Sequence, residues 1–183
     1  MIAIITYDTP HRKTQDIVIK LLLHGYSDLT LVVIPWFKRK NFQPLYMHRP
    51  TNPVSLGIEE LAENINIDFE RVEINDLEQY FSSFSFKHIL IAGAGILPEN
   101  LVKKHKLINA HPGFLPDVKG LDAFKWAILK GEKIGVTTHY VSEKADEGEL
   151  IDKREVTCFF EDSFFSLAMR VYETEIQMLV NSI

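Results

Sequence analysis

The chain has almost no cysteine, no long apolar run and no excess of basic residues. Cys158 is the one cysteine among 183 residues, so no internal disulfide can form and metal sites built on several thiolates are excluded. The longest apolar stretch, residues 29–37, is about half of what spans a bilayer. Lysine and arginine number 20 against 25 acidic residues, and the net charge of −5 argues against a nucleic-acid or membrane-surface binder.

The remaining composition is that of an ordinary globular protein, with 46% apolar and 25% charged residues. No basic region precedes the apolar residues 1–5, and Asp8 follows soon after them, so we expect no signal peptide and a cytoplasmic location. The length predicts one domain covering residues 1–183.

Short apolar runs alternate with amphipathic stretches along the chain. We expect strands at 2–6, 29–34, 69–74, 88–92, 106–109, 135–141 and 150–156, and helices at 12–24, 55–64, 77–84, 98–104, 123–129 and 161–180. Gly25 is expected to end the first helix and Ser55 to cap the second. Residues 36–53 form a long loop, which is usually functional or mobile.

This alternation predicts an α/β fold, with a mostly parallel sheet and helices on both of its faces. Ligands of such sheets bind beyond the carboxyl ends of the strands. We therefore expect residues 7–13, 93–97, 110–120 and 142–148 to lie along one edge and to hold the functional residues.

Asn109 and His111 stand at the end of one expected strand, just before a proline- and glycine-rich turn. Side chains alternate along a strand, so both residues point to the same side. An amide donor beside an imidazole can stabilise an oxyanion and move a proton. A strand end with a satisfied histidine explains the same residues, and Asp146 taken alone is better explained as a solvated loop acid or a turn former.

Three spaced motifs favour the functional interpretation of Asn109, His111 and Asp146. They are N-x-H-P-x-x-L-P-x-x-x-G at 109–120, G-V-T-x-H-x-V at 135–141 and D-x-G-x-x-I at 146–151. Together they resemble the catalytic domain of the folate-dependent formyltransferases, and the resemblance is continuous over about residues 89–156. It implies a Rossmann-like formyltransferase fold and transfer of a formyl group from 10-formyltetrahydrofolate to an amine, with no metal.

The resemblance also implies roles for the three polar residues. Asn109 would bind the formyl oxygen, and His111 would stabilise the oxyanion as the amine attacks. Asp146 would orient or charge that imidazole and help to pass the amine proton to the leaving nitrogen of the folate. Leu115–Pro116 lies in the following turn, where a cis peptide is expected.

Two segments are implied to bind the folate. Their residues are Gly95, Ile96, Leu97, Tyr140, Val141 and Glu143. A plain strand-to-helix turn explains residues 93–97 equally well. We interpret His139 as a core residue and Cys158 as a packing residue.

The acceptor is less well defined than the donor. Residues 7–13 contain no glycine, although the purine enzyme of this family cradles its substrate phosphate there with a glycine-rich turn. The candidates for acceptor binding are Arg12, Lys13, Lys38, Arg39 and Glu175. An exposed helix start and a solvated helical acid remain alternatives for Arg12, Lys13 and Glu175.

Our leading hypothesis is a small phosphorylated amine, above all an amino sugar on a nucleotide carrier. The alternative acceptor is phosphoribosylglycinamide, as in purine biosynthesis, and a folate-binding protein without turnover belongs to a different functional class. No nucleic-acid or membrane partner is expected, and a homodimer is left open.

Overall fold

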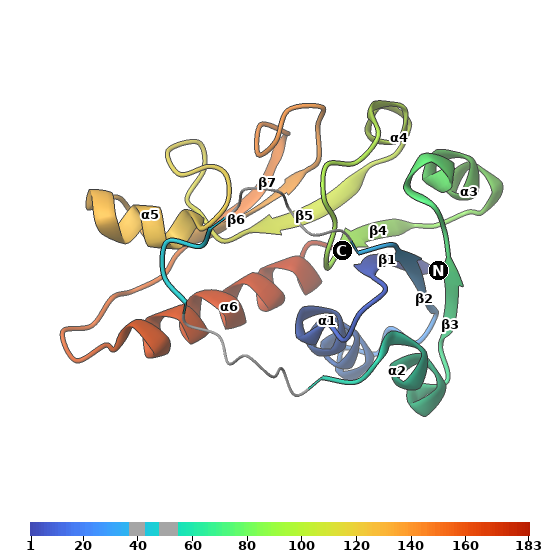
Figure 1. The fold of residues 1–183 in the computed structure, drawn as a ribbon, viewed down its shortest axis with the longest axis horizontal. Coiled ribbons are helices and arrows are strands. Elements are labelled where there is room, and N and C mark those ends of the chain that lie inside the picture. The colour runs from blue at the N-terminus through green and yellow to red at the C-terminus, as the bar shows by residue number, and fades with distance from the viewer. Residues whose placement is uncertain (37–42, 48–54) are drawn as a thin grey trace. The chain divides into compact units, whose positions relative to one another are not determined.

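The structure is a computed structural model that describes residues 1–36, 43–47 and 55–183 (Figure 1). Most of the long loop expected at 36–53 lies outside these residues. The chain divides into two compact units, each of which is described by itself. The first comprises Met1–Lys38 with Thr51–Ile108, and the second comprises Arg39–Pro50 with Asn109–Ile183.

The first unit is built on parallel strands. They are β1 (Ile2–Tyr7), β2 (Leu29–Ile34), β3 (Asp68–Arg71) and β4 (His88–Ile91), in the spatial order β3-β2-β1-β4. Every residue of β2 is buried, as are the first five of β1. Successive side chains of a strand point to opposite faces, so both faces of these strands are covered, as expected from their unbroken apolar sequence.

The helices of the first unit are short. They are α1 (Arg12–Leu23), α2 (Ile58–Ile65), α3 (Leu77–Ser83) and α4 (Glu99–Lys104), with a 3₁₀ turn η1 at Ile74–Asp76. Gly25 follows α1 with a φ of +86°, which glycine adopts at no steric cost, and so confirms the expected end. The expected cap is wrong, because Gly57 precedes α2 and the buried Ser55 hydroxyl makes no hydrogen bond among the described residues.

The second unit contains an antiparallel pair and two helices. Strand β5 (Leu107–His111) leads into it, followed by α5 (Ala123–Lys130), β6 (Gly135–Tyr140), β7 (Leu150–Glu155) and α6 (Phe164–Val180). Helix α6 packs against β6, and β6 pairs with β7. The seven strands follow the order β3-β2-β1-β4-β5-β6-β7 and are mostly parallel, which confirms the expected fold class.

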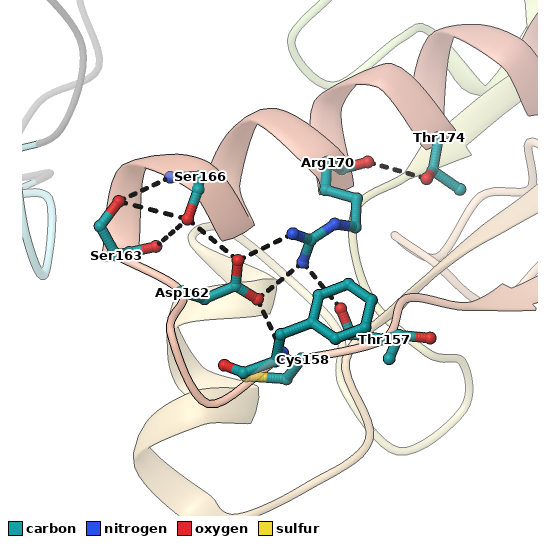
Figure 2. Close-up of polar contacts among 8 residues, drawn as sticks. Thr157, Cys158, Asp162, Ser163, Ser166, Arg170 and Thr174 are labelled. Carbon is teal, nitrogen blue, oxygen red and sulfur yellow. Dashed lines mark hydrogen bonds and ion pairs between the residues drawn. The ribbon is translucent and has the colours of Figure 1, made fainter.

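Helix α6 begins three residues later than expected because a buried carboxylate holds the preceding loop. Both carboxylate oxygens of Asp162 accept hydrogen bonds of 2.7 Å from the Arg170 guanidinium (Figure 2). Asp162 also accepts from the Phe159 amide at 2.8 Å, and Arg170 donates to the Thr157 carbonyl. The Ser163 hydroxyl then caps the helix by accepting from the Ser166 amide.

These bonds hold the pKa of Asp162 well below its usual value. The largest cause is the Arg170 side chain, followed by the Phe159 amide, and both favour the ionised form. Within the described parts of the chain, no helix combines the length and apolar character needed to cross a bilayer.

We expect Asp162→Asn to lower Tm by at least about 2 °C at neutral pH, because the bidentate pair with Arg170 is lost. A lowered pKa in the folded state stabilises the fold above the usual value of 3.8, and this contribution diminishes as the pH falls from 3.8 toward the folded-state pKa. The gap between wild type and variant should therefore narrow in acid. Thermal unfolding across about pH 2–7 measures it, with the exposed neighbour change Glu161→Gln as control. A gap that stays constant with pH would contradict the expectation.

Candidate active site

His111 is buried at the carboxyl end of β5 and touches a polar group at each ring nitrogen. Its Nε2 lies 2.9 Å from the carbonyl oxygen of Val118. A carbonyl only accepts, so Nε2 carries a proton and donates. Its Nδ1 faces Asp146 Oδ1 at 3.4 Å. A carboxylate only accepts, so this contact is attractive when Nδ1 also carries a proton.

The turn after His111 requires glycine. A Cβ on Gly113 would lie 2.5 Å from the Val118 carbonyl oxygen and 2.6 Å from His111 Nε2. The Thr137 hydroxyl on β6 holds this turn, since it donates to the Gly113 carbonyl at 2.8 Å and accepts from the Leu115 amide at 3.1 Å. The cis peptide expected at Leu115–Pro116 is present.

Asp146 is fixed from both sides of its carboxylate. Oδ2 accepts a 2.8 Å hydrogen bond from the Gly120 amide, while Oδ1 faces His111 Nδ1 and lies 3.8 Å from His139 Nε2. Its φ is +56°, in the left-handed region that aspartate tolerates better than most residues. Its side chain is 14% exposed, so the carboxylate is not the solvated loop acid of the alternative reading.

His139 on β6 lies between the Asp146 carboxylate and the Asn109 amide. Its Nδ1 donates to the Tyr140 carbonyl at 2.9 Å, which leaves Nε2 to accept from Asn109 Nδ2 at 3.4 Å. Burial lowers the pKa of His139, against smaller raising effects from the Tyr140 carbonyl and Asp146, so the neutral ring is favoured. The residue is buried as the core interpretation requires, but it also orients Asn109.

This arrangement suits acyl transfer to an amine. Asn109 and His111 supply N–H donors from alternate positions of one strand, and Asp146 supplies a carboxylate on the far side of the imidazole. Donors stabilise negative charge on an oxygen, and a carboxylate stabilises a neighbouring cation or receives a proton. The structure therefore brings together the three residues to which the sequence assigned the chemistry.

The expected folate residues lie in different units and are described separately. In the first unit Gly95, Ile96 and Leu97 follow β4, and the Ile96 side chain is 89% exposed. In the second unit Tyr140 ends β6, and Val141 and Glu143 lie in the loop that follows. Gly148 closes that loop, because a Cβ there would lie 1.7 Å from the Tyr140 carbonyl oxygen.

Of the expected acceptor residues, Arg12 and Lys13 belong to the first unit and Glu175 to the second. Arg12 makes an i,i+4 ion pair of 3.3 Å with Asp16, and Lys13 lies beside it in the first turn of α1. Glu175 is buried on α6 rather than solvated. Lys38 and Arg39 lie outside the described residues.

Sequence reasoning missed a polar chain at the end of β1. His11 Nδ1 lies 2.8 Å from the Thr14 hydroxyl, which lies 2.5 Å from the Thr6 hydroxyl. The rings of Tyr7 and His11 also press on Gly93, where a Cβ would lie 2.8 Å from each. Neither threonine carries a sequence signal, since both are ordinary residues of an amphipathic pattern.

No cluster of His, Cys, Asp and Glu suited to a metal ion occurs in the described ranges.

We expect the His139 ring to protonate only below the usual pKa of 6.5, with its single proton on Nδ1 in the neutral form, because burial lowers its pKa. Nitrogen-15 NMR of the ring identifies the tautomer and follows the titration. Since the unfolded chain binds this proton more readily than the folded one, His139 should also destabilise the fold as the pH drops below 6.5. A His139 ring that protonates at or above 6.5 would contradict the assignment.

Known proteins are similar to this chain in sequence and in fold. Residues 32–183 match the family model described as Formyl transferase. Methionyl-tRNA formyltransferase of Geobacillus sp. (strain WCH70) is 31% identical over 162 residues, which cover 85% of this chain and 48% of that protein. This chain spans 32%, 48% and 57% of the lengths of three methionyl-tRNA formyltransferases.

Solved structures cover nearly the whole chain. Phosphoribosylglycinamide formyltransferase from Anaplasma phagocytophilum aligns with a TM-score of 0.71 and 25% identity, over 99% of this chain and 83% of that one. A sugar N-formyltransferase from a Shewanella species aligns with a TM-score of 0.67 and 19% identity, over 99% and 67%. The family uses 10-formyltetrahydrofolate as formyl donor. On the match over residues 32–183, this chain belongs to the formyl transferase family.

Proposed function

We propose that this chain transfers a formyl group from 10-formyltetrahydrofolate to the amine of a small phosphorylated acceptor, an amino sugar on a nucleotide carrier. The observation that carries the reaction is the contact of His111 Nδ1 with Asp146 Oδ1, beside Asn109 on the same strand. Binding alone does not require a proton-sharing pair next to an amide donor, which speaks against a folate-binding protein without turnover.

The amine attacks the formyl carbon, a carbon–nitrogen bond forms, and the carbonyl electron pair moves to oxygen. Asn109 donates to that oxygen, and the His111 ring, when Nδ1 also carries a proton, stabilises its negative charge electrostatically. The attacking nitrogen becomes positive and loses a proton, which Asp146 helps to remove. The bond from carbon to the folate nitrogen then breaks, and that nitrogen takes up a proton. The charges of the intermediate match the residues in number and sign.

The proposed donor contacts come from the residues that the resemblance implies. They are Gly95, Ile96, Leu97, Tyr140, Val141 and Glu143. The exposed apolar side chain of Ile96 supports this assignment, since burial against a flat aromatic ring would remove it from water.

The proposed acceptor contacts use side-chain cations, because no glycine between residues 7 and 13 allows the close backbone approach of a phosphate-binding turn. Arg12, Lys13, Lys38 and Arg39 supply positive charge for a diphosphate, and Glu175 faces the amine. Phosphoribosylglycinamide remains the second candidate, favoured by the 83% coverage of the Anaplasma enzyme.

We expect His111→Asn and Asp146→Asn each to lower kcat by at least about a hundredfold, because a positioned acid–base group contributes that much or more. The measurement is formyl transfer from 10-formyltetrahydrofolate to amine. Asp146→Asn preserves volume, His111→Asn replaces the ring by a smaller polar side chain, and far-UV circular dichroism checks that both variants are folded. Asp152→Asn on the exposed strand β7 serves as control. A folded variant with near-normal turnover would contradict the mechanism.

The acceptor is tested with nucleotide-linked amino sugars and phosphoribosylglycinamide. We expect the amino sugars to be formylated, and Arg12→Gln with Lys13→Gln to raise the acceptor KM while the folate KM is unchanged. Lys38→Gln with Arg39→Gln should act in the same way, and Lys20→Gln at the other end of α1 is the control. The effect should shrink at high salt. Efficient turnover of phosphoribosylglycinamide alone would reject the amino-sugar assignment.

A further inference from the structure

Lys125 on α5 is a lysine in the protein interior, only 5% exposed. Its Nζ lies 2.7 Å from Asp122 Oδ1 and donates to the Tyr46 carbonyl oxygen at 2.7 Å. A buried ammonium is retained only when it is paired and hydrogen-bonded, and Lys125 meets both conditions. A buried ion pair stabilises a fold less than apolar packing does. We therefore interpret this pair as one that fixes the positions of the groups it contacts.

The Asp122 side chain pairs with Lys125 instead of capping helix α5. It precedes α5 as its N-cap residue, yet its side chain makes no cap hydrogen bond. Instead, Oδ2 accepts the Leu45 amide at 2.7 Å while Oδ1 faces Lys125. Its φ of +57° lies in the left-handed region, which most residues avoid. Both carboxylate oxygens therefore hold a segment that lies far away in the sequence.

That segment, residues 43–47, is also anchored by an aromatic ring. Tyr46 meets Phe164 of α6 edge to face at 4.8 Å, and Phe164 lies 5.5 Å from Phe124 of α5. Two backbone groups and one ring thus fix the segment, although the side chains of Leu45, Tyr46 and Met47 stay exposed.

The same turn that holds residues 43–47 also holds the catalytic carboxylate. The Gly120 amide donates to Asp146 Oδ2, and Asp122 follows two residues later. The amine must approach Asp146, since that carboxylate helps to remove its proton. Residues 43–47 are therefore fixed to the turn that also holds the Asp146 carboxylate, which supports placing them beside the path of the acceptor.

We propose that Asp122 and Lys125 are positioning residues that lock Leu45 and Tyr46 in place as part of the acceptor-binding wall. The lock acts through the backbone and touches neither the folate nor the reacting atoms. This inference rests on the proposed function for its reference to an acceptor, whereas the lock itself is defined by the three contacts of Asp122 and Lys125.

The test compares Lys125→Met with Lys130→Met, which makes the same change at an exposed position of the same helix. Because Lys125→Met leaves Asp122 unpaired and can misfold, the double variant Asp122→Asn/Lys125→Met, which removes both charges, is measured as well. Hydrogen exchange followed by mass spectrometry reports on the peptide that contains residues 43–47. We expect exchange at least about tenfold faster in both lock variants and unchanged exchange in Lys130→Met.

Steady-state kinetics of the same proteins use 10-formyltetrahydrofolate and whichever amine of the panel the wild type formylates. The lock variants should raise the acceptor KM at least about fivefold, with the folate KM within about twofold of wild type. A purely structural role would lower the amount of active enzyme, and hence kcat, without moving the acceptor KM. A folded double variant with wild-type exchange or a wild-type acceptor KM would overturn the proposal. If the wild type formylates no amine of the panel, the proposed function is rejected. Hydrogen exchange of the peptide containing residues 43–47 would still decide whether Asp122 and Lys125 hold this segment.

Discussion

The carboxylate of Asp146 is the point on which the polar geometry of the second unit depends. One of its oxygens is held by the Gly120 amide, and the other faces the imidazoles of His111 and His139. Removing the amide would let the carboxylate turn away from His111 Nδ1. The left-handed backbone at Asp146 is consistent with this demand, since such a conformation persists where the surroundings over-determine it. The turn that supplies Gly120 continues into Asp122, so the position of the carboxylate and of residues 43–47 share one support.

Close backbone approach explains why the motifs contain glycine where they do. At Gly113 the space of a Cβ is taken by the Val118 carbonyl and the His111 ring, and at Gly148 it is taken by the Tyr140 carbonyl. Gly120, the last glycine of the first motif, has a φ of +83° and open space around it, so its requirement is conformational instead. Each of the three glycines thereby serves the same end, which is to bring backbone carbonyls or amides against the polar side chains.

Much of the architecture could be predicted because apolar runs and turn residues encode it directly. The fully buried β2 follows from its unbroken apolar sequence, and the end of α1 follows from Gly25. The later start of α6 could not be predicted, since it depends on the contact of Asp162 with Arg170 and the Phe159 amide. The site shows the same division. Asn109, His111 and Asp146 carry a sequence motif, whereas the Val118 carbonyl that fixes the His111 ring is a backbone group, and any residue supplies one.

Two backbone carbonyls each accept a proton from one ring nitrogen, Nε2 of His111 and Nδ1 of His139, and this difference separates the roles of the two histidines. Val118 takes the Nε2 proton of His111, so His111 turns Nδ1 toward Asp146. Tyr140 takes the Nδ1 proton of His139, so His139 turns an Nε2 lone pair toward Asn109. Burial lowers the pKa of His139 and keeps this lone pair available. His111 can therefore share a proton with the carboxylate, while His139 orients the amide without competing for that proton. The Asp146 carboxylate thus pairs with His111, while His139 acts on Asn109.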